Sequence, residues 1–317
     1  MSRCHLFFLS ITLISYYSTL IGNAQVFEKT AEMKGDIVEF PITLINAYPF
    51  ISATVNGEKG KFMFDTGFAA SIFLNDNLLS LPDKKLKGNG TTGSGQSFKI
   101  YLNDSISNIL FTNGLTYKNL EKISSGNFNF IQEHITPDFL GFLGYKFFKD
   151  YLFKIDYLKR KITFYKNSLE RNVSKDFLAD EEVLAVIDFD IRTLENIPLV
   201  KLKIHDIEVL GEFDTGQNGF LQLDNTSFNQ LVSKDYLRCS GVESNGEALL
   251  TVKDIIMDGK IKMTLKGVES SPLEDTQNQK NKAGITEPNL MTIGYRFLME
   301  YKTVWDYHNK KIYILEY

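Results

Sequence analysis

The sequence predicts a mainly β protein built from two similar lobes, each a small β-barrel-like unit with short helices. Three observations predict this class. Segments with the two-residue alternation of β-strands run through much of the chain. The tripeptide Asp-Thr-Gly occurs twice, at residues 65–67 and 214–216. Further residues recur at nearly the same offset, which indicates two copies of one structural unit.

The duplication extends well beyond the tripeptides. Two long segments match, FLGYKFFKDYLFKIDYLKRKITFYK from Phe142 and TIGYRFLMEYKTVWDYHNKKIYILEY from Thr292. They begin 150 positions apart. We therefore expect one lobe at residues 25–172 and the other at 173–317, with the polar stretch 167–182 as the linker between them. A second polar stretch, 268–288, is expected to be a surface loop.

The strands of each lobe follow from local patterns. In the first half, Asn56-Gly57 stands between two apolar runs and predicts a tight β-hairpin. In the second half, the strict alternation of Val200, Leu202 and Ile204 predicts a strand with one buried face.

The matched segments predict the same elements twice. Gly144 and Gly294 each precede one or two helical turns, and a hairpin follows in both halves. Asp156 and Asp306 stand just before the hairpin turns, where aspartate usually stabilises the turn. Trp305 lies on a predicted strand and is expected in the core.

Composition limits the function classes. The 317 residues are 43% hydrophobic and 23% charged, with a formal net charge of -4, as in ordinary globular proteins. No basic block is present, so a nucleic-acid partner is not expected. The four histidines have no metal-ligand spacing, so we expect neither a metal site nor a cofactor.

Residues 1–24 resemble a signal peptide. Arg3 precedes an apolar run, and small residues up to Ala24 offer a cleavage site. A membrane anchor is the alternative, which the shortness of the run disfavours. Cleavage would remove Cys4 and leave Cys239, which is expected to be a small apolar filler. The mature protein is then expected to be secreted or periplasmic, with no stable membrane span.

The duplicated acids, Asp65 and Asp214, suggest one site at the boundary between the lobes. Two carboxyl groups in contact cannot both ionise cheaply, so such a pair shares a proton and can act as general acid and general base. The threonines that follow can hydrogen-bond across the boundary, and the glycines allow close approach and unusual backbone dihedrals. These supporting residues are Thr66, Gly67, Thr215 and Gly216.

These motifs resemble those of the aspartic proteases of the retropepsin and pepsin clan, over nearly all of the mature chain. The matching parts are the two Asp-Thr-Gly tripeptides and the elements Phe142-Leu143-Gly144 and Thr292-Ile293-Gly294. The Asp-Tyr-x-x-x-Lys hairpins that follow look like those of exported bacterial retropepsin-like proteins. The resemblance implies a bilobal acid-protease fold in which each glycine element passes behind a catalytic loop.

The resemblance also implies residue roles. Asp65 and Asp214 would form the catalytic dyad around a water, and a flap would cover the cleft. The candidate flap is the glycine-rich stretch 88–101, for which a plain exposed loop is the alternative. Its candidate residues are Gly90, Thr91, Thr92 and Gly93.

The chain departs from the family at the residue after each tripeptide. Phe68 and Gln217 stand where the family has a small residue that can carry a hydroxyl group. Ser71 is a candidate source of a hydroxyl in the first half, but Phe220 occupies the matching place in the second. A missing hydroxyl leaves an aspartate less acidic. We therefore expect a mildly acidic to neutral pH optimum.

These features together predict an exported aspartic-type endopeptidase that hydrolyses an extended peptide or protein substrate. Because both acids lie on one chain, a monomer is expected to suffice. A catalytically inactive peptide-binding protein of the same fold is the alternative. A carbohydrate-binding β protein is a weaker one, because it would not require paired Asp-Thr-Gly loops.

Overall fold

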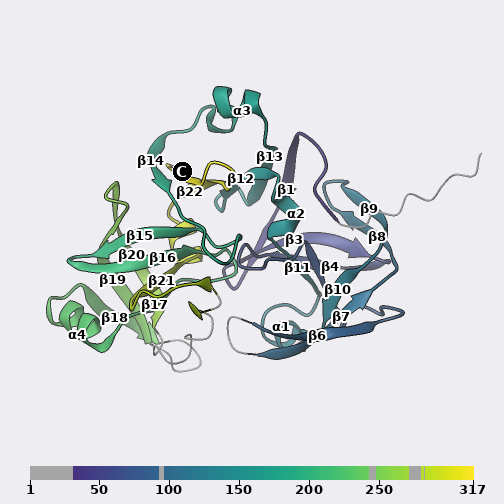
Figure 1. The fold of residues 1–317 in the computed structure, drawn as a ribbon, viewed down its shortest axis with the longest axis horizontal. Helices are drawn as coiled ribbons and strands as arrows, with labels where there is room; N and C mark the ends of the chain where they lie inside the picture. Colours follow the sequence, from purple (N-terminus) through teal and green to yellow (C-terminus); the bar gives the residue numbers. More distant parts are fainter. Residues whose placement is uncertain (1–30, 93–95, 243–247, 271–279, 282) are drawn as a thin grey trace, which may run out of the picture.

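The computed structural model describes residues 31–92, 96–242, 248–270, 280–281 and 283–317. The predicted signal peptide and Gly93 lie outside these residues. Two β-rich halves stand side by side, and a sheet that takes strands from both halves joins them (Figure 1). The predicted fold class, mainly β with two barrel-like lobes, is confirmed.

The joining sheet has six strands, all antiparallel, and its two central strands come from different halves. Phe153 of β12 pairs with Trp305 of β22 at this centre. In spatial order the strands are β1 (Ile37–Pro41), β13 (Lys161–Lys166), β12 (Tyr151–Asp156), β22 (Lys302–Asp306), β23 (Lys311–Leu315) and β14 (Val183–Asp188). The matched hairpins therefore pair with each other.

The first half builds a ten-stranded sheet on one side of the joining sheet. Its strands, in spatial order, are β6 (Lys85–Thr91), β7 (Ser97–Asn103), β10 (Ile123–Gly126), β5 (Ile72–Asn75), β11 (Phe139–Leu143), β4 (Glu58–Phe64), β3 (Tyr48–Val55), β8 (Ile106–Phe111) and β9 (Thr116–Leu120), with β2 (Thr43–Ile45) paired to β3. The Asn56-Gly57 hairpin is confirmed between β3 and β4, with both turn residues at positive φ, as a type I′ turn requires.

The second half builds a seven-stranded sheet, which curls so that β15 also pairs with β19. Its strands, in spatial order, are β15 (Leu199–Ile204), β16 (Ile207–Phe213), β21 (Leu290–Ile293), β17 (Phe220–Gln222), β20 (Ile261–Ser270), β19 (Ala248–Met257) and β18 (Leu237–Val242). The alternating residues Val200, Leu202 and Ile204 are all buried, as predicted. Cys239 is exposed on β18, so its prediction as an apolar filler is wrong.

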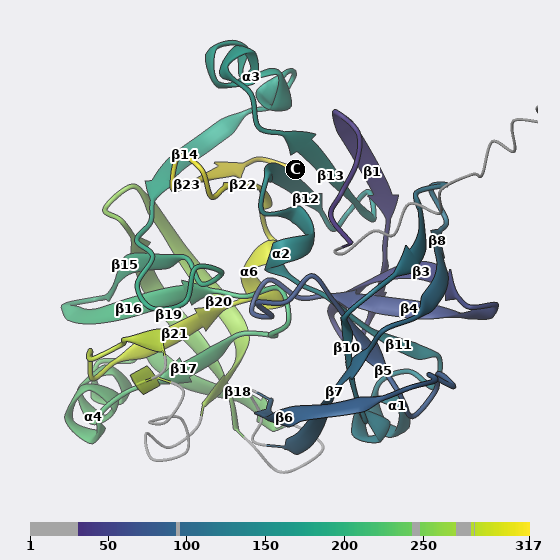
Figure 2. The same ribbon diagram turned by 45° about the vertical axis from the view of Figure 1, so that its right-hand side comes forward.

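The described helices are short, and α2 and α6 lie in the middle of the molecule, between the joining sheet and the sheets of the two halves (Figure 2). The two predicted helical turns after the motif glycines are α2 (Tyr145–Phe148) and α6 (Tyr295–Leu298). The described residues also form α1 (Asn129–His134), α3 (Leu169–Ser174), the 3-10 turn η1 (Asp176–Leu178) and α4 (Asn225–Ser233). Within the described ranges, no helix is long and apolar enough to cross a membrane.

The predicted linker is more structured than its polar sequence suggests. It contains α3 and η1, and the expected boundary between residues 172 and 173 falls inside α3. The Ser168 side chain caps α3 by accepting a hydrogen bond from the Arg171 amide. Arg171, only 6% exposed, forms ion pairs with Asp36 at 3.0 Å and Asp176 at 2.9 Å. A buried arginine thus orders a segment that carries no strand or helix periodicity.

Trp305 connects the cores of the two halves. It is fully buried, and its ring lies 5.1 Å from Phe153 of the first half and 5.3 Å from Phe213 of the second. Its indole N–H donates to the Thr303 hydroxyl at 2.8 Å. The predicted core position is confirmed, and the residue packs between the lobes as well as within one.

We expect Trp305→Ala to lower the free energy of unfolding by about 3–5 kcal/mol, because it removes a large buried ring that both halves contact. Urea denaturation followed by far-UV circular dichroism would measure the loss, because this signal comes from the backbone and does not require Trp305. Leu158→Ala is the control, since that side chain is 66% exposed and should change stability by less than about 0.5 kcal/mol. Equal effects of the two substitutions would contradict the role of Trp305.

Candidate active site

The two predicted acids stand directly after matching strands. Asp65 follows β4 and Asp214 follows β16, and each strand pairs in parallel with the strand of its glycine element. The Asp65 amide donates to the Leu143 carbonyl at 3.0 Å, and the Asp214 amide donates to the Ile293 carbonyl at 3.0 Å. The glycine elements therefore support the two acid loops from behind, as the sequence motifs imply.

The glycines of these elements are required by space. A Cβ on Gly144 would lie 2.2 Å from the Phe68 carbonyl oxygen, and a Cβ on Gly294 would lie 2.0 Å from that of Gln217. Neither distance is possible between non-bonded atoms. The close approach lets the amides that follow, for example that of Tyr145 toward Phe68 at 2.8 Å, hydrogen-bond back to the acid loops.

Thr66 and Thr215 join the two loops across the boundary between the halves. The Thr66 amide donates to the Thr215 hydroxyl oxygen at 3.0 Å, and the Thr215 amide donates to the Thr66 hydroxyl oxygen at 3.0 Å. The Thr215 hydroxyl in turn donates to the Phe64 carbonyl at 2.9 Å. Both threonines are fully buried, so each half supplies partners that the other half's backbone cannot find elsewhere.

Gly67 and Gly216 bring each acid against the opposite half. A Cβ on Gly67 would lie 2.3 Å from Asp214 Oδ2, and a Cβ on Gly216 would lie 2.6 Å from Asp65 Cγ. Neither glycine has a positive φ, so the expected need for unusual dihedrals is wrong. The glycines are needed for space, because the absence of a side chain lets the two carboxyl groups lie in direct contact with each other.

The two carboxyl groups have unequal surroundings. Asp214 Oδ1 accepts hydrogen bonds from the amides of Gly67 at 3.0 Å and Gly216 at 2.8 Å. Asp65 Oδ1 is buried and has no hydrogen-bond partner among the described residues. Burial and then the neighbouring Asp214 raise the pKa of Asp65 well above its usual value. Burial also raises the pKa of Asp214, but the two amides oppose this. The hydrogen bonds therefore favour the carboxylate form of Asp214 more than that of Asp65.

The hydroxyl sources considered in the sequence do not reach the acids. The Ser71 hydroxyl donates to the Ala31 carbonyl oxygen instead. The Phe68 ring stacks on Phe142 at 5.0 Å and packs edge-on against Phe73 at 5.3 Å. Within the described residues, no hydroxyl group donates to either carboxylate. The lack of such a donor was the reason for predicting that the two acids are less acidic than in the family.

Asn196 is a site residue that the sequence analysis missed. Its side-chain amide donates to the backbone carbonyls of Thr66 at 3.0 Å and Gly67 at 2.8 Å, across the boundary between the halves. The Tyr307 hydroxyl donates to the Asn196 carbonyl at 3.1 Å. The residue at the matching position of the first half is Ala47, so the repeat does not mark Asn196. It fixes the first acid loop from the second half.

The candidate flap residues lie on a hairpin of the first half. Gly90 and Thr91 end β6, and Thr92 follows. A Cβ on Gly90 would lie 2.5 Å from the Phe98 ring of β7, which packs on Phe128 of the aromatic cluster below. The hairpin extends from the first half toward the second in both views (Figures 1 and 2).

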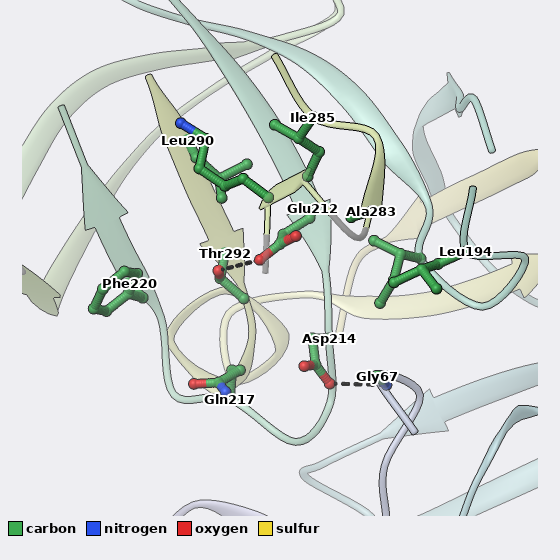
Figure 3. Close-up of a pocket in the computed structure, with 12 residues that line it drawn as sticks. Gly67, Leu194, Glu212, Asp214, Gln217, Phe220, Ala283, Ile285, Leu290 and Thr292 are labelled. Atoms are coloured by element: carbon green, nitrogen blue, oxygen red, sulfur yellow. Dashed lines mark hydrogen bonds between the residues drawn. The ribbon is translucent and has the colours of Figure 1, made fainter. Parts of the chain in front are cut away.

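A cavity of about 210 Å³ lies beside Asp214 in the second half. Glu212 of β16 and Asp214, directly after that strand, both line it, and the Thr292 hydroxyl donates to Glu212 at 2.7 Å (Figure 3). The expected surface loop 268–288 contributes Lys280, Ala283 and Ile285 to the wall, so that prediction is wrong for these buried residues.

Glu212 is the second residue that the sequence analysis missed. Burial is the main cause that raises its pKa to about 7, and the neighbouring Asp214 adds to the effect. A signal was present in the repeat, because the matching residue of the first half is Met63. A carboxyl group at a position that is apolar in the other copy marks a difference between the two walls.

Because the pKa of Glu212 is higher in the folded protein, the folded state binds its proton more strongly than the unfolded chain does. Stability from this group is therefore highest below pH 4.5 and falls as the pH rises to about 7. We expect the stability of wild type relative to Glu212→Gln to fall by about 2 kcal/mol between pH 5 and pH 8. Urea titrations of both proteins would measure it, and parallel pH dependences would contradict it.

We expect Thr215→Val to lower the free energy of unfolding by about 3 kcal/mol, because it leaves the buried Thr66 amide and Phe64 carbonyl without their partner. Urea denaturation would measure the change. Thr112→Val, at an exposed position, is the matched control. A loss no larger than that of the control would show that the boundary between the halves does not depend on this exchange.

Among the described residues, no group of three or more His, Cys, Asp or Glu side chains could hold a metal ion. No protein-family model matches this chain, and no curated protein sequence does.

Solved structures with the same fold are found. Basic 7S globulin from soybean superposes with a TM-score of 0.53 at 11% identity, over 88% of this chain and 95% of the globulin. An aspartic proteinase from Irpex lacteus superposes with a TM-score of 0.51 at 12% identity, over 88% of this chain and 97% of the proteinase. At such identities the likeness concerns the fold alone. The chain has the two-lobed fold of the pepsin-like aspartic proteinases.

Proposed function

We propose that this protein is an aspartic endopeptidase. Its substrate binds between its two lobes, residues 25–172 and 173–317, and a peptide bond of the substrate is hydrolysed there. The observation that carries the proposal is the unequal pair of Asp65 and Asp214, whose contact depends on hydrogen bonds exchanged between the two halves. One acid keeps a proton and the other is stabilised as a carboxylate, so an acid and a base stand at one point.

The chemistry follows from this inequality. The Asp214 carboxylate takes a proton from a water molecule while the water oxygen attacks the substrate carbonyl carbon. Asp65 donates its proton to the carbonyl oxygen, which gives a neutral tetrahedral diol. Collapse of the diol transfers a proton to the leaving nitrogen, breaks the C–N bond and leaves one proton on the pair. The two amides that donate to Asp214 favour this division of roles.

The substrate would be a peptide in extended conformation, because two β-rich walls flank the acids and a strand-like backbone can hydrogen-bond to them. The β6–β7 hairpin, which carries Gly90, Thr91 and Thr92, would act as the flap; Gly93, the fourth candidate residue, lies outside the described residues. Since both acids belong to one chain, a monomer would be active. Export through the N-terminal segment would place the enzyme in the periplasm or outside the cell.

Both Asp65→Asn and Asp214→Asn should lower kcat/KM for a peptide substrate by about a thousandfold or more, because each removes one half of the proton exchange. Asp83→Asn is the matched control, since that acid is exposed and belongs to neither acid loop. Cleavage of unfolded casein and of a quenched fluorescent peptide library would be measured. Cleavage that survives either catalytic substitution would refute the assignment of these two acids as acid and base.

The wild-type pH profile should be bell-shaped and displaced toward neutral pH. Activity requires one proton on the pair, and burial raises the pKa of both acids, so both limbs should move to higher pH. A profile with full activity only at the acid extreme would contradict this. Tight binding of a hydroxyl-containing transition-state mimic without any cleavage would instead indicate a peptide-binding protein.

A further inference from the structure

The two walls beside the acids have opposite chemistry at three matched positions. In the first half these are Met63, Phe68 and Phe142, which belong to one aromatic and aliphatic cluster. In the second half they are Glu212, Gln217 and Thr292, which all line the cavity beside Asp214. The two halves therefore share strand pairing at these positions, but the wall is apolar in the first half and polar in the second.

The central pair of each wall shows the exchange most directly. Met63 lies opposite Phe142 in the register of β4 and β11, and Glu212 lies opposite Thr292 in the register of β16 and β21. In the first half the Phe68 ring covers this pair by stacking on Phe142. In the second half Gln217 stands at the matching place, and a cavity of about 210 Å³ is present.

The cavity has the size and place of a pocket for one side chain. It is smaller than the roughly 300–1,000 Å³ pockets that hold whole small molecules. Gly67 and Asp214 form part of its wall, so a substrate carbonyl at the acids would place a neighbouring side chain at its mouth. Leu194, Ile197 and Ile285 supply apolar surface along which the carbon stem of a long side chain can pack.

We propose, on the basis of the endopeptidase function above, that this cavity selects a lysine or arginine side chain next to the scissile bond, and that the Thr292-held Glu212 carboxylate is the specificity-determining group. One Glu212 oxygen accepts from Thr292, and the other accepts no hydrogen bond from the described residues. A substrate ammonium or guanidinium group would supply the missing donor and the opposite charge.

Lys280 does not already fill this role. Its ammonium group donates to the Glu287 carbonyl at 2.7 Å, and no ion pair within 4.0 Å joins it to Glu212 in the described parts of the chain. Within the described residues, the charged groups near Glu212 are Asp214 and Lys280. Of these two, Asp214 raises the pKa of Glu212 and Lys280 lowers it. Glu212 and Asp214 therefore lie near a single cation among the described residues, Lys280, which already donates to the Glu287 carbonyl. This balance of charge favours binding of a second positive group over a negative one.

The selectivity should depend on pH. In the protein without substrate, the pKa of Glu212 is raised by burial to about 7. The carboxylate, which attracts a cation, therefore dominates at pH 8, and the neutral acid dominates at pH 5. The ratio of kcat/KM values for two peptides cancels the pH dependence of the Asp65 and Asp214 pair, which acts on both peptides alike. The ratio therefore reports the pocket alone.

The test uses peptide pairs that differ only in Lys against norleucine, at one or the other residue flanking the scissile bond. For one of these positions, the Lys/norleucine ratio of kcat/KM should be about tenfold or more at pH 8 and should fall toward 1 at pH 5. Glu212→Gln should bring the ratio to about 1 or below at both pH values. Glu208→Gln, which removes an exposed acid from the same strand, should leave the ratio as in wild type.

A wild-type ratio of 1 or below at both positions, a preference for an acidic side chain, or a ratio that Glu212→Gln does not change would overturn the proposal. If Glu212→Gln does not fold, Glu212→Met copies the first-half residue and should reverse the preference. If wild type cleaves no peptide, the endopeptidase function fails separately. The pocket is then tested by binding, where the Lys peptide should bind wild type about tenfold more tightly than the norleucine peptide and Glu212→Gln should lose this difference.

Discussion

The reciprocal hydrogen bonds between Thr66 and Thr215 are the interaction on which the rest of the structure depends. Each buried amide finds its acceptor on the other half, so neither acid loop is satisfied without its counterpart. The exchange has a fixed geometry, because each hydroxyl must meet an amide across the boundary. It therefore positions both the loops and the carboxyl groups that precede the threonines by one residue.

The same contacts make the two acids unequal. Gly67 and Gly216 admit the opposite carboxyl group because they carry no side chain, and both of their amides donate to Asp214. Asp65 keeps one buried oxygen, Oδ1, without a hydrogen-bond partner among the described residues. A nearly two-fold backbone thus produces an asymmetric electrostatic environment, and this asymmetry separates the acid from the base in the proposed reaction.

The two copies differ in the side chains around this shared frame. The cross-strand pair beside the acids is Met63 with Phe142 in one half and Glu212 with Thr292 in the other. Such exchanges leave the sheet register intact, since strand pairing is a property of the backbone. They alter what each wall can bind, which is how a duplicated fold acquires two different sides to one cleft.

The sequence by itself determined the duplicated fold, the two acid loops, the threonine contacts and the Asn56-Gly57 hairpin, because each depends on residue type at short or repeated spacing. Only the tertiary structure decided that Arg171 orders the linker, that Asn196 clamps the first acid loop, and that Glu212 and part of the 268–288 segment line the cavity. These features join residues far apart in the chain. Their burial and partners arise only when the two halves pack together, and no local pattern encodes that packing.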